Sequence, residues 1–305
     1  MLSLIILSFN SSKTLIDVYK HFVKHLEIEN IPFEIVIMDD GSDDKSFEIA
    51  QQLTIEDSRV SAYQLSRNFS THYSIFAGLT KVSGKCAVPI PDDFQVPVET
   101  ILEMYRLWEN GNKIIVPYRK NRDDGFIVDA FSNLYYKIMN NFSEINFPKG
   151  GSDLFLIDQE IIDIINRNIH PKNTSTIVEV LRLGFNPVFI PMSRNKSVNE
   201  KSRWTFKKKI RLALDTFIST SSFPIKLISF LGIISSIISF TMIFYYIYAK
   251  LTGMIEVPGW TLIVIYISLF NGLILFSLGI IAEYIWRIFE EVKDRPGYII
   301  KKNSK

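Results

Sequence analysis

The chain has 305 residues, enough for one large domain and a smaller additional part. Hydrophobic residues make up 47% of it and the mean hydropathy is +0.15, which indicates that part of the chain lies in lipid. The net charge of +2 is too balanced to favour a nucleic-acid-binding protein. A single cysteine, Cys86, excludes an intrachain disulfide, and its apolar neighbours predict a core residue.

The first part of the chain shows apolar runs separated by polar breaks at short intervals. The predicted strands are residues 2–8, 34–38, 60–65 and 86–90, and the helices between them begin near residues 11 or 12, 44 and 71. The first run lacks a basic leader, so it is not expected to be a signal peptide. Strands that alternate with helices at this spacing are typical of a doubly wound, parallel α/β sheet.

Two of the predicted strands end in a pair of aspartates. Asp39 and Asp40 follow the second strand, and Asp92 and Asp93 follow the fourth. Open α/β sheets bind ligands at the carboxyl ends of their strands, where carboxylates accept from a nucleobase or ribose, or hold a cation beside a diphosphate. The alternative is that Asp39 and Asp43 only shape the turn and cap the next helix. Two neighbouring strands that both end in aspartates favour the ligand-binding alternative. Carboxylates gathered at one edge of a sheet repel one another unless a cation or a hydrogen-bond donor lies among them.

The third strand ends in a basic residue, Arg67, just before the predicted helix over 71–81. A helix N-terminus favours an anion, so Arg67 and the helix together suit a phosphate group. An arginine at a strand end is also often only solvated, which makes this residue a weak indication by itself.

Three motifs in this order resemble one known family. Met38-Asp39-Asp40-Gly41-Ser42, Ser66-Arg67-Asn68-Phe69 and Asp92-Asp93-Phe94-Gln95-Val96-Pro97 are similar to the nucleotide-sugar-binding domain of family 2 glycosyltransferases, which has the Rossmann-like GT-A fold. The resemblance is closer to the polyprenyl-phosphate glycosyltransferases, of the bactoprenol glucosyltransferase and dolichol-phosphate mannose synthase type. It implies an inverting enzyme that moves a sugar from a nucleotide-diphosphate sugar, a UDP-hexose such as UDP-glucose, to undecaprenyl phosphate.

The resemblance also implies roles for residues on the donor side. Asp40 is expected to accept from the base, uracil or guanine, and Asp39 to help hold the nucleoside. Phe9 and Asn10 stand where the family has a Tyr-Asn pair that lines the base pocket. Asp93 matches the aspartate that binds Mg²⁺ or Mn²⁺. The other residues expected to bind the nucleotide sugar are Arg67, Asn68, Asp92, Gln95, Lys201 and Arg203.

On the acceptor side, a basic turn resembles the one that meets the lipid phosphate in the family. It contains Arg119, Lys120 and Arg122, and guanidinium groups suit phosphate, although a solvated turn is the alternative. Asp153 falls on the aspartate proposed as base or organiser. A phosphate acceptor is already ionised, so Asp153 is expected mainly to orient groups, unless it is only a strand-start carboxylate. The expected catalytic residues are Asp153, Asp93 and Arg119.

The chain departs from the family pattern at two informative positions. Pro91 replaces the first aspartate of the Asp-x-Asp motif, and Asp129 stands where a further basic residue is usual. These departures motivate a second hypothesis, in which the acceptor is a hydroxyl, for example of a lipid-linked glycan, and Asp153 is a true base. A third hypothesis is a catalytically inactive membrane scaffold that binds nucleotide sugar.

The C-terminal part predicts a membrane anchor. Residues 227–249 and 260–282 contain no charge, and at about 1.5 Å per residue each is long enough to cross a hydrocarbon core of about 30 Å. They predict a transmembrane hairpin. Basic residues on both outer flanks place both termini in the cytoplasm, at the inner (plasma) membrane. Oligomeric state stays open.

The predicted organisation therefore has four parts. Residues 1–203 form the cytoplasmic GT-A domain, and 204–222, where lysines alternate with apolar residues, form an amphipathic helix in the membrane interface. Residues 223–292 form the hairpin, and 293–305 form a basic cytoplasmic tail.

Overall fold

The computed structural model describes residues 1–119, 148, 152–169, 171, 175–193, 223–252, 259–293 and 295–304. The chain divides into two compact units. The first comprises Met1–Thr220 together with Pro296–Lys305, and the second comprises Ser221–Arg295. Each unit is described by itself.

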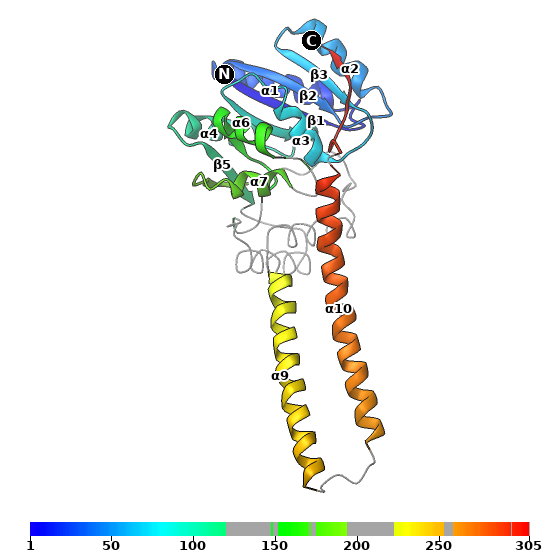
Figure 1. Cartoon of the computed structure of the whole chain (residues 1–305). Helices are drawn as coiled ribbons and strands as arrows, with labels where there is room; N and C mark the ends of the chain where they lie inside the picture. Colours follow the sequence, from blue (N-terminus) through cyan, green and yellow to red (C-terminus); the bar gives the residue numbers. More distant parts are fainter. Residues whose placement is uncertain are drawn as a thin grey trace. The chain divides into compact units, whose positions relative to one another are not determined.

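Within the described residues, the first unit is built on an eight-stranded mixed sheet (Figure 1). The strands are β1 (Leu2–Ser8), β2 (Phe33–Asp39), β3 (Val60–Leu65), β4 (Cys86–Pro91), β5 (Ile114–Arg119), β6 (Leu156–Asp158), β7 (Val188–Met192) and β8 (Ile300–Ser304). Their order is β7-β5-β6-β4-β1-β2-β3-β8. β4, β1, β2 and β3 are parallel, whereas β6 and β8 run antiparallel to their neighbours. The predicted parallel α/β core is confirmed, and antiparallel strands extend it.

Helices cover both faces of this sheet. They are α1 (Leu15–Ile28), α2 (Ser46–Glu56), α3 (Thr71–Leu79), α4 (Val98–Glu109), α6 (Gln159–Asn168) and α7 (Thr176–Arg182). Buried residues of α1, α2 and α4 form one hydrophobic cluster with the sheet, and those of α3, α6 and α7 form another. Two faces covered by helices explain why the parallel strands are almost continuously apolar.

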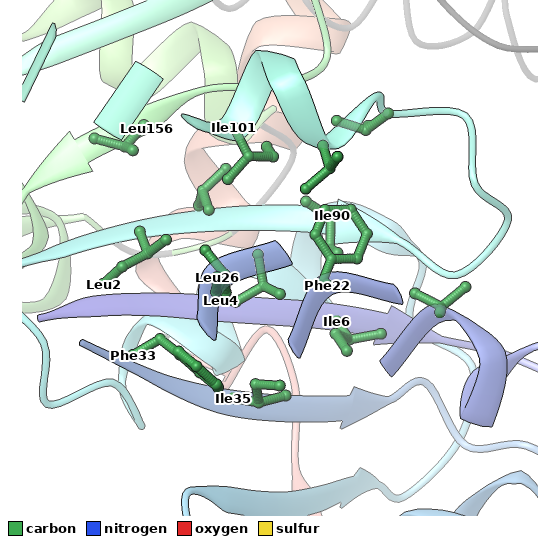
Figure 2. Close-up of a cluster of buried hydrophobic side chains, with 14 of the residues drawn as sticks. Leu2, Leu4, Ile6, Phe22, Leu26, Phe33, Ile35, Ile90, Ile101 and Leu156 are labelled. Carbon is green, nitrogen blue, oxygen red and sulfur yellow. The ribbon is translucent and has the colours of Figure 1, made fainter. Parts of the chain in front are cut away.

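Helix α1 illustrates how the sequence pattern produces the packing. Leu15, Val18, Phe22 and Leu26 recur at helical spacing and are at most 1% exposed. Figure 2 shows Phe22 and Leu26 beside Leu4 of β1. Burial of each such side chain contributes about 1.5–3 kcal/mol relative to exposure.

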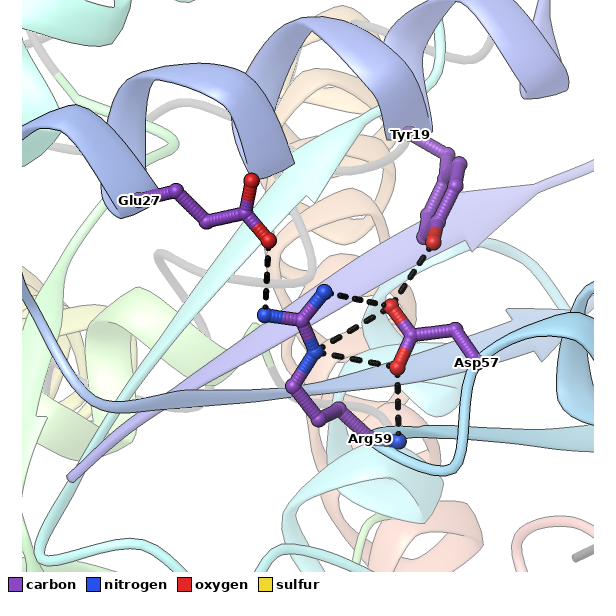
Figure 3. A network of polar contacts seen from close by, with 4 residues as sticks. All are labelled: Tyr19, Glu27, Asp57 and Arg59. Atoms are coloured by element: carbon purple, nitrogen blue, oxygen red, sulfur yellow. Dashed lines mark hydrogen bonds and ion pairs between the residues drawn. The ribbon is translucent and has the colours of Figure 1, made fainter.

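A polar network of four residues lies at the amino end of β3 and joins it to helix α1 (Figure 3). The guanidinium of Arg59 pairs with Glu27 at 2.9 Å and with Asp57 at 2.8 Å, and the Tyr19 hydroxyl donates to Asp57 at 2.8 Å. Hydrogen bonding and charge from Arg59 lower the pKa of Asp57 to about 2. The network ties α1 to the connection between α2 and β3.

The last residues of the chain form a strand that the sequence does not predict. Within the predicted basic tail 293–305, Ile300–Ser304 forms β8 and pairs antiparallel with β3. The strand has one apolar residue among lysines and polar residues, so hydrophobic alternation gives no signal for it. Without β8, β3 would be an edge strand with unpaired N–H and C=O groups, and pairing with residues 300–304 satisfies them. The predicted boundary at 203 and the interfacial helix over 204–222 lie outside the described residues.

The second unit contains two helices, α9 (Phe223–Leu251) and α10 (Trp260–Val292), which contact each other. Within the part of the chain that the structure describes, one stretch is long and apolar enough to cross a membrane. It is Leu269–Trp286, with a mean hydropathy of 1.7. The predicted helices are therefore present, but the two-helix transmembrane hairpin is not confirmed.

Candidate functional site

Four parallel strands end together at one edge of the sheet. The register pairs Ser8 with Asp39, Asp39 with Gln64, and Leu7 with Pro91. The loops after β1, β2, β3 and β4 therefore lie side by side, as expected for strands that share a direction. These loops contain the predicted donor-side residues from Phe9 to Gln95.

The first acidic pair splits between the two faces of the sheet. Asp39 is fully buried and accepts from the backbone N–H of Ser42 at 2.9 Å, from the Ser42 hydroxyl, and from Gln64 Nε2 at 3.0 Å. These contacts shape the turn after β2. They agree with the structural alternative for Asp39, and its role with a nucleoside stays a prediction.

Asp40 lies on the other face and binds the start of α3. Its carboxylate accepts from the backbone N–H groups of Phe69 at 2.8 Å and Ser70 at 3.0 Å. Burial raises the pKa of Asp40 to about 6, although these two hydrogen bonds act against the rise. The N–H of the N-cap residue Ser70, and that of the residue before it, are thus already donated to Asp40. Base recognition by Asp40 stays a prediction.

Gly41 allows the loop after β2 to touch the loop after β3. Its φ is +69°, and a Cβ at this position would lie 2.5 Å from the carbonyl carbon of Arg67. A larger residue meets both a strained backbone and a steric overlap. The glycine of the predicted motif therefore joins the two donor-side loops.

The loop after β1 is linked to both acidic pairs. The N–H of Asn10 donates to the Ser42 hydroxyl at 2.9 Å, and its side-chain oxygen accepts from the N–H of Asp43 at 3.1 Å. The N–H of Phe9 donates to Asp92 at 3.2 Å. The structure thus brings Phe9 and Asn10 beside the acidic strand ends, and their role in lining a base pocket stays a prediction.

The second acidic pair also divides into an inner and an outer residue. Asp92 is 5% exposed and accepts from the N–H of Phe9 and the hydroxyl of Ser11, so it fixes the loop after β1. Asp93 is half-buried and accepts from the backbone N–H and the side-chain amide of Gln95. Asp93, rather than Asp92, is the member of this pair with more access to solvent.

Asp93 fits a cation that is shared with a substrate. Among the described residues, no group of three or more histidine, cysteine or acidic side chains lies together as a metal site. Mg²⁺ and Mn²⁺ commonly bind through one or two carboxylates, with substrate phosphates and water supplying the other ligands. A single half-buried aspartate at a strand end suits that arrangement and does not suit a closed cage of protein ligands.

The loop after β3 presents its polar side chains outward. Arg67 and Asn68 are exposed, and the guanidinium of Arg67 lies 4.1 Å from the centre of the Phe69 ring. The guanidinium is available to a phosphate at the same edge as Asp93.

The charge of Asp153 acts on His72, a residue for which the sequence predicts no role. Asp153 is exposed, and the adjacent Ser152 hydroxyl donates to the carbonyl of Pro117 in β5 at 2.5 Å. Burial lowers the pKa of His72, at the start of α3, to about 4, and the charge of Asp153 acts against that fall. Ser175 Oγ lies 3.4 Å from His72 Nδ1. Only the tertiary structure joins these segments, so no local pattern signals His72.

Several predicted residues lie at or beyond the limits of the described part of the chain. Arg119 is the last residue of β5, and only its backbone belongs to that part. Lys120, Arg122, Lys201 and Arg203 lie outside the described residues, as does Asp129.

A hollow of about 610 Å³ lies elsewhere, along one side of α6 from its first residue to its last. It is lined by residues that include Asp158, which pairs with Cys86, the first residue of β4. The hollow is thus at the amino end of the parallel strands, and the strand-end loops give the better candidate site.

The chain is similar to known proteins of one family. Residues 3–164 match the family model described as glycosyl transferase family 2. The glycosyltransferase YkcC of Bacillus subtilis (strain 168) is 30% identical over 99% of this chain and 93% of its own length. The bactoprenol glucosyl transferase of Shigella phage SfII is 29% identical over 100% of this chain and 98% of its own length. Among solved structures, the mannosyltransferase PcManGT of Pyrobaculum calidifontis, in complex with GDP-Man and Mn²⁺, is 12% identical, with a TM-score of 0.49 over 72% of this chain and 63% of that one.

Proposed function

The chain belongs to glycosyl transferase family 2, and from that premise we propose that this glycosyltransferase moves a hexose from a nucleotide-diphosphate sugar to a polyprenyl phosphate at the cytoplasmic face of the membrane. UDP-glucose is the proposed donor and undecaprenyl phosphate the proposed acceptor. The observation that carries the proposal is the convergence of Asn10, Asp40, Arg67 and Asp93 on one sheet edge. Full-length similarity to a relative named bactoprenol glucosyl transferase supports the choice of acceptor.

On the donor side, Asp93 would hold Mg²⁺ or Mn²⁺ against the diphosphate. A bound cation would offset the negative charge that grows on the leaving diphosphate. The exposed Arg67 guanidinium would contact phosphate oxygens, and Phe9 and Asn10 would border the base. Lys201 and Arg203 are proposed to neutralise the leaving group as well.

On the acceptor side, a phosphate oxygen would attack C1 of the sugar as the bond between C1 and the diphosphate breaks. The sugar becomes linked to the polyprenyl phosphate with inverted configuration, and the nucleoside diphosphate leaves. The attacking oxygen is already ionised near neutral pH, so no proton has to be removed. Arg119, Lys120 and Arg122 are proposed to bind the acceptor phosphate, and Asp153 to orient it.

A polyprenyl acceptor requires the enzyme to work at a bilayer. Leu269–Trp286 in α10 has the length and composition of a membrane span. We propose that α9 and α10 together form a hairpin with both chain ends in the cytoplasm. A cysteine placed in the connection between the helices would then react with an impermeant thiol reagent only from the outer side of the membrane.

The deciding experiment offers the full chain, in detergent, a panel of radiolabelled nucleotide sugars with undecaprenyl phosphate. A labelled lipid that releases its sugar in mild acid supports the proposal and identifies the donor. Loss of product with EDTA, and recovery with Mg²⁺ or Mn²⁺, supports a cation at Asp93. No lipid product from any donor, together with measurable nucleotide-sugar binding, overturns the polyprenyl-phosphate acceptor.

Asp153→Asn separates the proposed acceptor from a hydroxyl acceptor. With a phosphate acceptor the variant keeps measurable transfer, because Asp153 only orients groups. With a hydroxyl acceptor the lost base reduces turnover by about 10²–10⁴-fold while donor binding stays unchanged. Transfer rate and donor affinity are measured on the same preparation.

A further inference from the structure

The C-terminal strand continues its pairing beyond the end of β3. β8 pairs with β3 from Ala62 opposite Ser304 to Leu65 opposite Ile300, with an irregularity between Gln64 and Leu65. One residue further, the N–H of Ser66 donates to the carbonyl of Ile299 at 2.8 Å. Ser66 begins the loop that carries Arg67 and Asn68, so the C-terminal segment holds this loop at its first residue.

The residues just before β8 are closely fitted to the catalytic unit. Any Cβ at Gly297 would overlap the carbonyl oxygen of Pro171 and would lie 3.0 Å from the Tyr73 ring. Tyr298 and Ile300 pack against the buried cluster that includes Tyr63 and Leu65 of β3. Burial raises the pKa of the Tyr298 hydroxyl, which is consistent with this packing. The segment 297–300 is therefore anchored by shape as well as by backbone pairing.

Three contacts from different parts of the chain then support the loop after β3. Asp40 accepts from the N–H groups of Phe69 and Ser70 at its far end. Gly41 packs against the backbone of Arg67 at its centre. Ile299 binds Ser66 at its beginning. The first two supports come from the loop after β2, and the third comes from the C-terminus, more than 200 residues away in sequence.

We propose that residues 297–300 are a positioning segment for the nucleotide-sugar site. The carbonyl of Ile299 orients Ser66, and through it Arg67 and Asn68, for contact with the diphosphate of the donor. Gly297, Tyr298 and Ile300 hold that carbonyl in place and do not touch the donor. The inference rests on the proposed function only in placing the donor on Arg67 and Asn68. Holding a loop in its bound geometry before the ligand arrives lowers the cost of binding.

The test compares the full-length double variant Tyr298→Ala/Ile300→Ala with Lys301→Ala. Lys301 is exposed on the same strand and is the matched control. UDP and GDP are each titrated calorimetrically into the detergent-solubilised proteins, and the nucleotide that binds the wild type is used. We expect the Kd to rise at least tenfold in the double variant and to stay within twofold in the control. The KM for the donor should rise with it, while kcat at saturating donor stays within threefold.

A merely structural role gives a different result, because partial unfolding lowers the number of binding sites and kcat but leaves Kd and KM unchanged. That outcome overturns the proposal. Hydrogen exchange provides a second measurement: the amide of Ser66 should exchange faster in the double variant, and unchanged exchange at Ser66 also overturns it. Gly297→Ala should act in the same direction as the double variant.

Failure of the proposed function is distinguishable from failure of this inference. If the wild type binds UDP or GDP but transfers no sugar to undecaprenyl phosphate, the proposed acceptor is wrong. The proposal of a positioning segment is then still tested by the Kd values of the double variant and the control. If neither nucleotide binds the wild type in the presence of Mg²⁺ or Mn²⁺, the proposed donor site is wrong. That result also overturns the proposal that residues 297–300 position this site.

Discussion

The carboxyl groups at the two ends of the parallel strands lie in different surroundings. At the amino ends, Asp57 is paired with Arg59, and Glu34 accepts from Ser3 and from the residues before β4. At the carboxyl ends, Asp39 and Asp40 are buried and accept from hydroxyl, amide and backbone N–H groups.

The pKa values differ accordingly. Arg59 lowers the pKa of Asp57 to about 2, whereas burial raises that of Asp40 to about 6. Carboxylates at the amino ends are stabilised by fixed partners and contribute to stability. A buried carboxylate with a raised pKa beside exposed polar loops is typical of a functional site. The comparison therefore distinguishes a structural edge of the sheet from the edge that we propose as the functional edge.

The largest effect is expected from Asp93→Asn at the functional edge. Removing the charge proposed to hold a cation should lower sugar transfer by about 10²–10³-fold, the loss typical when one charge-stabilising group is removed. The melting temperature should change by less than about 2 °C, because half-buried polar substitutions that break no buried network are close to neutral. Initial rates at saturating donor provide the measurement.

Glu99→Gln is the matched control for Asp93, since Glu99 is an exposed carboxylate in the first turn of α4. It should leave the rate within twofold. If both variants lose the same fraction of the transfer rate, the overall negative charge of this edge, and not Asp93 itself, supports transfer.

Gly41→Ala should break the contact between the two donor-side loops. The strained φ alone costs about 1–3 kcal/mol, and the overlap with the backbone of Arg67 adds to it. We expect a lower melting temperature and a weaker affinity for the nucleotide. Gly111→Ala has a similar positive φ with nothing within 4 Å, so it isolates the backbone strain from the overlap. Equal nucleotide affinity in the two variants would contradict the role of the contact.

Asp40→Asn should change how stability depends on pH at the functional edge. Because the folded pKa of about 6 exceeds the ordinary 3.8, the folded state takes up the proton more readily than the unfolded state. The contribution of Asp40 to the free energy of unfolding is therefore greatest below about pH 4. It falls by about 1–3 kcal/mol as the pH rises through about 6. Melting temperatures of both proteins from pH 4 to 7 test this. If the difference in melting temperature between the two proteins is the same at every pH, burial does not raise the pKa of Asp40.

Asp57→Asn should produce the smallest effect, with the opposite sign. The folded pKa of about 2 lies below the ordinary 3.8, so the stabilisation is present above about pH 4 and is lost as the pH falls towards 2. We expect about 1 kcal/mol, reduced by solvent screening because the Arg59 side chain is 39% exposed. Chemical denaturation at pH 2 and 5 provides the measurement. If the variant loses stability equally at both values, the pair with Arg59 does not account for the shift.

Much of this protein follows from the sequence alone. Apolar runs with polar ends predict β1 to β4, and the helical spacing of Leu15, Val18, Phe22 and Leu26 predicts the buried face of α1. Both patterns are local, since strand and helix periodicity are set by the backbone. The acidic strand ends and the family could be recognised for the same reason, because they are short motifs in a fixed order.

Only the tertiary structure decided how those motifs are used. Asp39 and Asp40 are adjacent in sequence, but Gln64 of β3 lies beside Asp39 and the residues before α3 lie beside Asp40, so the two carboxylates have different partners. Asp92 turns inward because Phe9 and Ser11 lie beside it, 81 or more residues away in sequence. β8 exists because the edge of β3 offers unpaired backbone groups to a segment with little strand character of its own. These outcomes depend on contacts between distant segments, which no local pattern encodes.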